Sequence, residues 1–259
     1  MSLYAYTGTR AFVASQPTVV FLHGAGNDHC VWAWQSRYLA HHGFNVLAYD
    51  LPGHGLSQDS VCHTVEEFAQ CIANDLNARS LQRIALVGHS MGSLIALAIT
   101  AALPGQISHL ALIGTAVPMA VGEVLLQAAA NDPHTAYAMI RDWGLSPTAQ
   151  WAANPAPGQC MSAGAVRLMD LQVPHRLHAD LQACKHFTDG LRLAENYHGK
   201  TMLILGAEDR MTLPKAAESL YQTLTRVEKH VLPGVGHNLM AEAPVSVRKL
   251  LYAFFTQAQ

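Results

Sequence analysis

The sequence predicts an α/β protein built on a mostly parallel central sheet with helices on both faces. Segments with strand and helix character alternate at short spacing, and the strand segments are continuously apolar rather than alternating in polarity. The bulk composition agrees with this class. The chain has 259 residues, 50% of them hydrophobic and 13% charged, which suits one large core, or a core with a lid, rather than two independent domains.

The first part of the chain carries a regular alternation of strands and helices. A loosely alternating stretch predicts a short hairpin over residues 4–14. Thr64 is suited to cap a helix because Glu67 stands three residues later, and another helix is expected over residues 31–42. Continuous apolar runs predict further strands at residues 18–22, 44–49, 84–87 and 109–113.

The alternation stops between about Pro118 and Asn196. Helix-like segments follow one another there without a strand between them, around a loop rich in Pro and Gly at residues 154–158. These predicted helices are residues 121–130, 136–143, 163–171 and 179–193. The break in the pattern predicts an inserted helical lid.

The α/β pattern then resumes to the end of the chain. Strands are expected at residues 201–205 and 229–232, with a helix opened by Pro214 between them and a final helix over residues 245–256. We therefore expect a core formed by residues 1–117 and 197–259. Residues 118–196 are expected to form a helical cap inserted after the sixth strand.

Charge and cysteine usage exclude several classes of protein. The formal net charge is −2 and there is no run of Lys or Arg, so we expect neither a nucleic-acid partner nor an anionic membrane partner. The five cysteines are scattered without a C-x-x-C pair, which indicates reduced thiols, no disulfide framework and no zinc site. The N-terminus lacks the pattern of a signal peptide, and no segment has the length of a membrane span, so a cytoplasmic location is expected.

The sequence GHSMG at residues 88–92 is the strongest local signal. It follows a buried strand and precedes a helix that is apolar almost all round, which is the context that G-x-S-x-G requires. The turn forces Ser90 into a crowded backbone conformation and lifts its hydroxyl above the sheet, at a helix N-terminus that favours an anion. Alone, this pattern could also be a glycine-rich turn whose serine only caps the helix.

A serine nucleophile needs a general base, and an acid to orient that base. His237 stands on a loop between the last strand and the last helix, at the sheet edge where ligands of open α/β proteins gather. The acid should lie between Ser90 and His237, just after a strand, and Asp209 fits this position. Its neighbour Glu208 is the alternative.

With these residues in place, the chain resembles the α/β-hydrolase superfamily over nearly its whole length apart from the cap. The matching motifs are HGAG at 23–26, DLPGHGLS at 50–57, GHSMG at 88–92, GAED at 206–209 and GH at 236–237. The order serine, acid, histidine is that of the family. The resemblance implies an α/β-hydrolase fold, no cofactor and no metal. It also implies an oxyanion hole formed by the backbone N–H groups of Ala25 and Met91.

Other polar residues near these motifs have simpler interpretations. Asp50 precedes Ser90, which is the wrong order for the acid, so we expect it to stabilise its loop. His23 and His89 flank the site and are expected to support the oxyanion loop and the elbow. His175 and His178 are spaced for a metal, but no carboxylate or cysteine pair at ligand spacing accompanies them.

The cap contains methionines and tryptophans that could face the serine. We expect Met119, Met139, Trp143 and Trp151 to line an apolar substrate pocket, which predicts an apolar, ester-type small molecule of moderate size. The alternative is that these side chains hold the cap helices together and onto the core. The sequence does not choose between the two, and it does not indicate an oligomeric state.

The leading functional hypothesis is a serine hydrolase, comparable to carboxylesterases, that cleaves a carboxylic ester or a lactone through an acyl-enzyme on Ser90. His237 is the general base and acid in this hypothesis, and Asp209 orients it. The same residues could act on a thioester, in acyl transfer or in carbon–carbon bond hydrolysis. A ligand receptor that turns over slowly is a further alternative, because receptors of this family keep the same residues.

Overall fold

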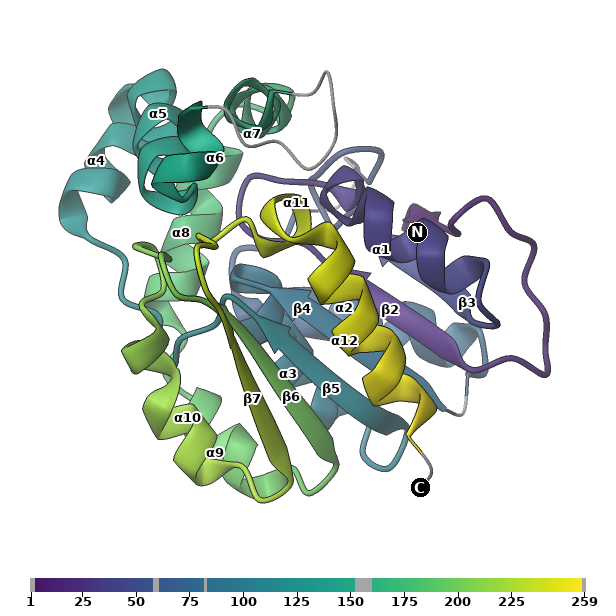
Figure 1. Cartoon of the computed structure of the whole chain (residues 1–259). Helices are drawn as coiled ribbons and strands as arrows, with labels where there is room; N and C mark the ends of the chain where they lie inside the picture. The colour runs from purple at the N-terminus through teal and green to yellow at the C-terminus, as the bar shows by residue number, and fades with distance from the viewer. Residues whose placement is uncertain (1–2, 58–60, 82, 152–159, 258–259) are drawn as a thin grey trace.

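The computed structural model describes residues 3–57, 61–81, 83–151 and 160–257. Within them, seven strands form one sheet in the order β1-β3-β2-β4-β5-β6-β7 (Figure 1). Strand β1 runs antiparallel to β3, and every other neighbouring pair is parallel, which confirms the predicted sheet. The strands are β1 Ala5–Tyr6, β2 Thr18–Leu22, β3 Asn45–Tyr49, β4 Ile84–His89, β5 Ile107–Ile113, β6 Lys200–Gly206 and β7 Val227–Leu232.

Helices cover both faces of this sheet. Figure 1 shows α1 and α12 on the near face and α2 and α3 behind the strands. The core helices are η1 His29–Trp32, α1 Ala33–Ala40, α2 Val65–Ala78, α3 Met91–Ala102, η2 Pro214–Ala217, α10 Glu218–Thr223, α11 Leu239–Glu242 and α12 Pro244–Thr256.

Strand β2 shows why the strand segments are apolar throughout. Its five residues are all buried. Val19 and Phe21 belong to the hydrophobic cluster that includes α1 and α12, whereas Val20 and Leu22 belong to the cluster that includes α2 and α3. Because successive side chains of a strand face opposite sides of the sheet, a sheet covered on both faces needs apolar residues at every position.

The predicted start of α2 is confirmed in detail. The Thr64 hydroxyl accepts a hydrogen bond from the backbone N–H of Glu67 at 3.1 Å. The Glu67 carboxylate reaches back to the backbone N–H of His63 at 2.7 Å. These bonds satisfy N–H groups that a helix start leaves without a partner, so the helix begins where the capping pattern places it.

The predicted hairpin over residues 4–14 is wrong. Only Ala5–Tyr6 forms a strand, and it pairs with β3 rather than with a second N-terminal strand. The side chain of Asn45 takes the place of that second strand by accepting from the N–H of Val13 and donating to its carbonyl, each at 2.8 Å. The helical insertion therefore follows the fifth strand of the described residues and not the sixth.

The insertion is helical, as predicted, with two differences. The short helix α6 at Pro147–Trp151 is not among the predicted helices. The expected single helix over residues 179–193 is two helices, because the chain turns between His186 and Gly190. A Cβ on Gly190 would lie 2.6 Å from Val117 Cγ1, so this turn packs closely against the core. The predicted loop at 154–158 lies outside the described residues. The helices are α4 Glu123–Asn131, α5 Pro133–Gly144, α6 Pro147–Trp151, α7 Met161–Asp170, α8 Arg176–His186 and α9 Gly190–Asn196.

These inserted helices occupy two places. Figure 1 shows α4 to α7 beyond the ends of the strands, whereas α9 lies beside α10 and packs against α3 of the core. The division into a core and a cap at residues 118 and 196 stays a prediction, and we propose that α4 to α7 form the outer part of the cap. No helix of the described residues is long and apolar enough to cross a membrane.

Candidate active site

The strand β4 ends in a sharp turn that carries Ser90 into α3. Ser90 has φ 52° and ψ −120°, a conformation that costs a residue with a side chain roughly 1–3 kcal/mol. Its backbone N–H donates to the carbonyl of Ile113 at 3.0 Å, and its own carbonyl accepts from the N–H of Ser93 at 2.8 Å. These bonds from two neighbouring elements hold the strained conformation in place.

The two glycines of this turn are required by close backbone contacts. A Cβ on Gly88 would lie 2.1 Å from the carbonyl oxygen of Gly92. A Cβ on Gly92 would lie 2.2 Å from the carbonyl oxygen of Leu22. Since real Cβ atoms do not approach backbone this closely, the G-x-S-x-G spacing follows from the packing of β4, β2 and α3.

Asp209 and His237 form a buried pair at the carboxyl edge of the sheet. The Nδ1–H of His237 donates to Oδ2 of Asp209 at 2.8 Å. Asp209 is 1% exposed, and its carboxylate also accepts from the N–H groups of Met211 and Thr212 and from the Thr212 hydroxyl, each at 2.8 Å. The neighbouring Glu208 is exposed, so the packing distinguishes the two carboxylates that the sequence left open.

Hydrogen bonding keeps the Asp209 carboxylate ionised. Burial on its own raises the pKa of this carboxyl group. The charge and hydrogen bond of His237, together with the hydrogen bonds from Thr212, outweigh burial and hold the pKa of Asp209 below its usual range. An ionised Asp209 fixes the proton of His237 on Nδ1 and leaves Nε2 to act as a base.

The loop that carries His237 is held from three directions. The backbone N–H of His237 donates to the carbonyl of Gly144, at the end of α5, at 2.6 Å. Its carbonyl accepts from Nε2 of His89 at 2.9 Å, and the preceding Gly236 N–H donates to Glu242 at 3.0 Å. The position of the imidazole therefore depends on both the core and the cap.

Ser90 and His237 line one cavity of about 200 Å³. Both residues are described, and no hydrogen bond joins the Ser90 hydroxyl to the His237 ring among the described residues. Such contacts between nucleophile and base are often long in a ligand-free enzyme and shorten when substrate binds. The structure thus brings Asp209 and His237 together and places Ser90 at the same cavity.

The expected supporting role of His23 is confirmed by its contacts, whereas the His89 ring supports the loop of His237 through the His237 carbonyl. His23 donates from Nδ1 to the carbonyl of Gly24 at 2.9 Å and accepts from the N–H of Leu51 at 3.0 Å. Burial is the main reason that the pKa of His23 falls to about 4 and that of His89 to about 3. Both rings are therefore neutral near pH 7, and each fixes a backbone carbonyl of the site.

The backbone N–H groups of Ala25 and Met91 face no competing acceptor. Among the described residues, no hydrogen bond engages either group. Ala25 lines the cavity beside Ser90, and Met91 opens α3 directly after the serine. This is the arrangement that two oxyanion donors need, and their role stays a proposal.

The cavity walls include only part of the predicted pocket. Met119 and Trp143 line it, as expected. Met139 is not among the residues that line the cavity and packs against the hydrophobic cluster of α4, α5, α7 and α8, so its assignment to the pocket is wrong. Trp151 is 85% exposed and borders a separate surface hollow, so its assignment is also wrong. A five-residue helix, α6, turns this side chain outward.

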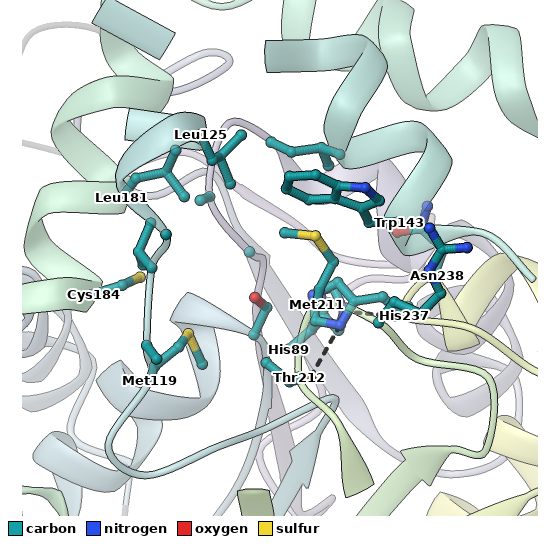
Figure 2. A pocket seen from close by; sticks show the side chains of 18 of the residues that line it. His89, Met119, Leu125, Trp143, Leu181, Cys184, Met211, Thr212, His237 and Asn238 are labelled. Atoms are coloured by element: carbon teal, nitrogen blue, oxygen red, sulfur yellow. Dashed lines mark hydrogen bonds between the residues drawn. The ribbon is translucent and has the colours of Figure 1, made fainter. Parts of the chain in front are cut away.

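Several cavity residues were missed from the sequence. Figure 2 shows that Met119, Leu125, Leu181 and Cys184 form one side of the cavity and that Trp143, Met211, His237 and Asn238 form the other. Asn238 directly follows the predicted base and Met211 stands two residues after the predicted acid, which is a signal that could have identified them. Leu181 and Cys184 carry no local signal, because the fold of α8 brings them to the site.

One group of described residues offers metal-ligand atoms. Asp28, His29 and Cys30 place one ligand atom each within 4.8 Å of the others. Local structure accounts for this cluster, because Asp28 caps η1 by accepting from the N–H of Cys30, and His29 donates to the buried Asp50 at 2.7 Å. Asp50 also accepts from the N–H of Leu56, which is the loop-stabilising role expected for it.

Comparison with known proteins agrees with this geometry. A family model described as alpha/beta hydrolase fold matches residues 17–244. A putative carbamate hydrolase, RutD, of Escherichia coli O6:H1 is 25% identical over 248 residues, covering 92% of this chain and 88% of its own. The RutD protein of Shigella flexneri serotype 5b is 26% identical over 254 residues, covering 92% and 91%.

Solved structures give the same fold. The enol-lactonase of Burkholderia xenovorans LB400 superposes with a TM-score of 0.87 at 21% identity, covering 98% of this chain and 96% of its own. An esterase from Exiguobacterium antarcticum gives a TM-score of 0.83 at 18% identity over the same shares of the two chains. The match of the family model over most of the sequence shows that this chain belongs to the alpha/beta hydrolase fold family and is a hydrolase.

Proposed function

We propose that this protein is a serine hydrolase that cleaves a carboxylic ester or a lactone through an acyl-enzyme on Ser90. One observation carries the proposal. A buried, hydrogen-bonded Asp209–His237 pair opens onto the same cavity as a serine held in the strained turn after β4. The names of similar proteins, an esterase and an enol-lactonase among them, support the bond type.

The chemistry follows from the positions of these groups. The Ser90 oxygen attacks the carbonyl carbon of the substrate while Nε2 of His237 takes the hydroxyl proton. The N–H groups of Ala25 and Met91 stabilise the negative charge on the carbonyl oxygen. The bond to the alcohol then breaks, and His237 returns the proton to the leaving oxygen. Water, activated by His237, releases the acid from Ser90 in the second half of the reaction.

The cavity favours an apolar substrate of limited size. Met119, Leu125 and Leu181 supply an apolar wall on one side of Ser90. Arg210 and Asn238 also line the cavity, and Figure 2 shows Asn238 on the side opposite Leu125 and Leu181. We therefore propose that a short apolar group binds against Leu125 and Leu181, with the more polar part of the substrate near Asn238.

A carbamate is the second candidate substrate, since the relatives that match most of this chain are named putative carbamate hydrolases. The same catalytic residues can act on an ester and on a carbamate, because a carbamate also has a carbonyl carbon that Ser90 can attack. Relative turnover of matched ester and carbamate substrates decides between them. Hydrolysis of a thioester, acyl transfer and carbon–carbon cleavage are further outcomes of the same comparison.

The test is a panel of p-nitrophenyl esters from acetate to decanoate, with lactones, thioesters and aryl carbamates, assayed on wild type, Ser90→Ala and Glu208→Gln. We expect turnover of esters or lactones by wild type and Glu208→Gln, and none by Ser90→Ala. Turnover that survives in Ser90→Ala contradicts the proposal. Tight binding of these compounds without turnover identifies a receptor instead.

A further inference from the structure

Asp180, on the cap helix α8, is a fully buried carboxylate outside the proposed catalytic residues. Its Oδ2 accepts from the backbone N–H of Gly26 at 2.8 Å and from Nε2 of His54 at 2.7 Å. Its Oδ1 accepts from Nε of Arg176 at 3.0 Å. Asp180 therefore joins the cap to two separate loops of the core, one of which carries Ala25.

This carboxylate is ionised in spite of its burial. Asp180 is 0% exposed, and Arg176, whose guanidinium also donates to the carbonyl of Cys62, is 4% exposed. Burial on its own raises the pKa of Asp180, but His54, Arg176 and the Gly26 N–H outweigh it and hold the pKa below its usual value. Taking an ion pair out of water is costly, and removing one partner of a buried pair leaves an uncompensated charge, so this pair holds α8 in one position against the core.

The group that it fixes is the peptide next to the proposed oxyanion donor. Ala25 lies between two peptide units. The unit before it is held through the Gly24 carbonyl, which accepts from His23, and the unit after it is held through the Gly26 N–H, which donates to Asp180. The Ala25 N–H lies in the first unit, and fixing the second unit restricts rotation about the Ala25 backbone, so the two bonds together restrain the direction of this N–H.

Gly26 makes this anchor necessary. Its φ is +64°, in the left-handed region, and a glycine there can reorient more freely than any other residue. A Cβ on Gly26 would lie 3.1 Å from Cδ1 of Leu177 on α8, so this side chain packs closely against the glycine. The same cap helix thus contacts the loop through an apolar side chain and holds its backbone through Asp180.

We propose that Asp180 is a positioning residue that couples the cap to the oxyanion hole. The cap then does more than cover the substrate, because docking of α8 holds the Ala25 N–H in the direction that the tetrahedral intermediate needs. This inference rests on the proposed function, since it assigns a role to Asp180 only in the reaction at Ser90.

The substitution Asp180→Asn tests this coupling. Its amide presents one acceptor where the carboxylate presents two, so either the Gly26 and His54 side or the Arg176 side loses its acceptor. If the Ala25 N–H loses its direction, kcat falls by about 10²-fold, as it does when one oxyanion donor is removed, while KM changes little. The double variant Arg176→Met/Asp180→Asn removes the unpaired guanidinium as well, which keeps the comparison available if the single variant folds poorly.

Gln172→Ala is the matched control. Gln172 lies in the cap segment directly before α8 and accepts from the N–H of Gly55 at 3.1 Å, so it also joins the cap to a glycine N–H of a core loop. Among the described residues, it makes no hydrogen bond to the peptide units on either side of Ala25. Its side-chain amide also donates to the Asp28 carboxylate at 3.5 Å and to the Leu168 carbonyl at 3.1 Å. Gln172→Ala therefore reports the effect of losing cap–core hydrogen bonds that do not involve these peptide units.

The experiment compares kcat, KM and the inhibition constant of an arylboronic acid, at a temperature well below the Tm of every variant. The boronic acid forms a tetrahedral adduct with a serine oxygen and places an oxygen in the oxyanion hole. We expect kcat and boronic-acid affinity to fall together, by about 10²-fold, in Asp180→Asn and in the double variant, with Gln172→Ala close to wild type.

Three results would contradict these expectations, and each has a different meaning. A lower Tm with unchanged kcat and boronic-acid affinity in both Asp180 variants shows that Asp180 only stabilises the cap, and the inference fails while the proposed function stands. An equal loss in Gln172→Ala also overturns it, because any cap–core bond then has the same effect. Turnover that survives in Ser90→Ala overturns the proposed function itself and this inference with it.

Discussion

The carbonyl of Gly144, the last residue of α5, accepts the backbone N–H of His237 at 2.6 Å. The candidate base is thus held by the cap as well as by the sheet on which its loop begins. Ser146, just beyond α5, extends this contact by donating its N–H to Glu242 at 3.1 Å, and Glu242 also accepts from Gly236. The loop of His237 is therefore joined to the end of α5 directly through Gly144 and, by way of Glu242, through Ser146.

Asp209→Asn should lose activity by orders of magnitude while remaining folded. An amide at 209 can present its NH₂ group to His237, which favours the tautomer that cannot act as a base toward Ser90. Steady-state kcat/KM and circular dichroism measure the two effects. Glu208→Gln is the control, because Glu208 is exposed. An active Asp209→Asn beside an inactive Glu208→Gln means that the wrong carboxylate has been assigned.

Glu242→Gln should lower kcat and stability modestly. Its carboxylate accepts from Gly236 and Ser146, and an amide oxygen keeps these bonds without the charge. Glu242→Ala removes both acceptors, so two N–H groups lose partners at roughly 1–3 kcal/mol for each group that stays buried. Urea unfolding and kcat are the measurements. Equal stability of the Ala and Gln variants contradicts this role.

Gly92→Ala should prevent normal folding. The new Cβ would lie 2.2 Å from the carbonyl oxygen of Leu22, and the backbone of β2 has no room to move away. Soluble expression and Tm measure the effect. Gly122→Ala is the matched control, because nothing lies within 4 Å of its Cβ position. A stable Gly92→Ala protein contradicts the packing described for the turn.

Trp143→Ala and Trp151→Ala should differ sharply. Trp143 lines the cavity, whereas Trp151 is 85% exposed. We expect Trp143→Ala to change KM and the preferred acyl length, and Trp151→Ala to leave both unchanged. Kinetics on the ester panel measures this difference. A larger effect at Trp151 than at Trp143 contradicts the described orientation of the two helices.

The protein should lose stability as the pH falls below about 6.5, the ordinary pKa of histidine. Folding lowers the pKa of His23 to about 4 and of His89 to about 3, mainly by burial. In that pH range the unfolded chain binds protons that the folded chain does not, so acid favours unfolding. Each such residue contributes a slope of up to about 1.4 kcal/mol per pH unit.

Urea unfolding at a series of pH values checks this prediction. His89→Gln removes one titrating group and should make the free energy of unfolding less dependent on pH between about 6.5 and 3. The variant loses some stability near neutral pH, so the comparison is between slopes rather than between absolute values. An unchanged slope in His89→Gln shows that another group causes the acid sensitivity.

Local sequence patterns predicted most of the fold and the central site. Parallel strands in a covered sheet are apolar at nearly every position, and G-x-S-x-G between a buried strand and a helix is typical of this kind of turn. Asp209 and His237 could be paired from the sequence because each stands within five residues of the end of a strand, at the edge where such sites form. These features depend on short stretches of chain, so they are readable without coordinates.

Features that depend on distant contacts were not predicted. Trp143 and Trp151 look alike in the sequence, and only the packing of α5 and α6 decides which one faces the cavity. The hairpin prediction failed because Asn45, far along the chain, satisfies the backbone of Val13. Asp180 bonds with His54, 126 residues away, and no local pattern marks either residue as a partner of the other.

The central claim is that Ser90 carries the acyl group, and mass spectrometry of an acyl-enzyme tests it most directly. The enzyme is mixed with an activated ester, quenched in acid within the first turnover, digested and sequenced. We predict an acyl adduct on Ser90 that is absent from Ser90→Ala and accumulates less in His237→Ala. An adduct on another residue, or turnover by Ser90→Ala at the wild-type rate, contradicts the account.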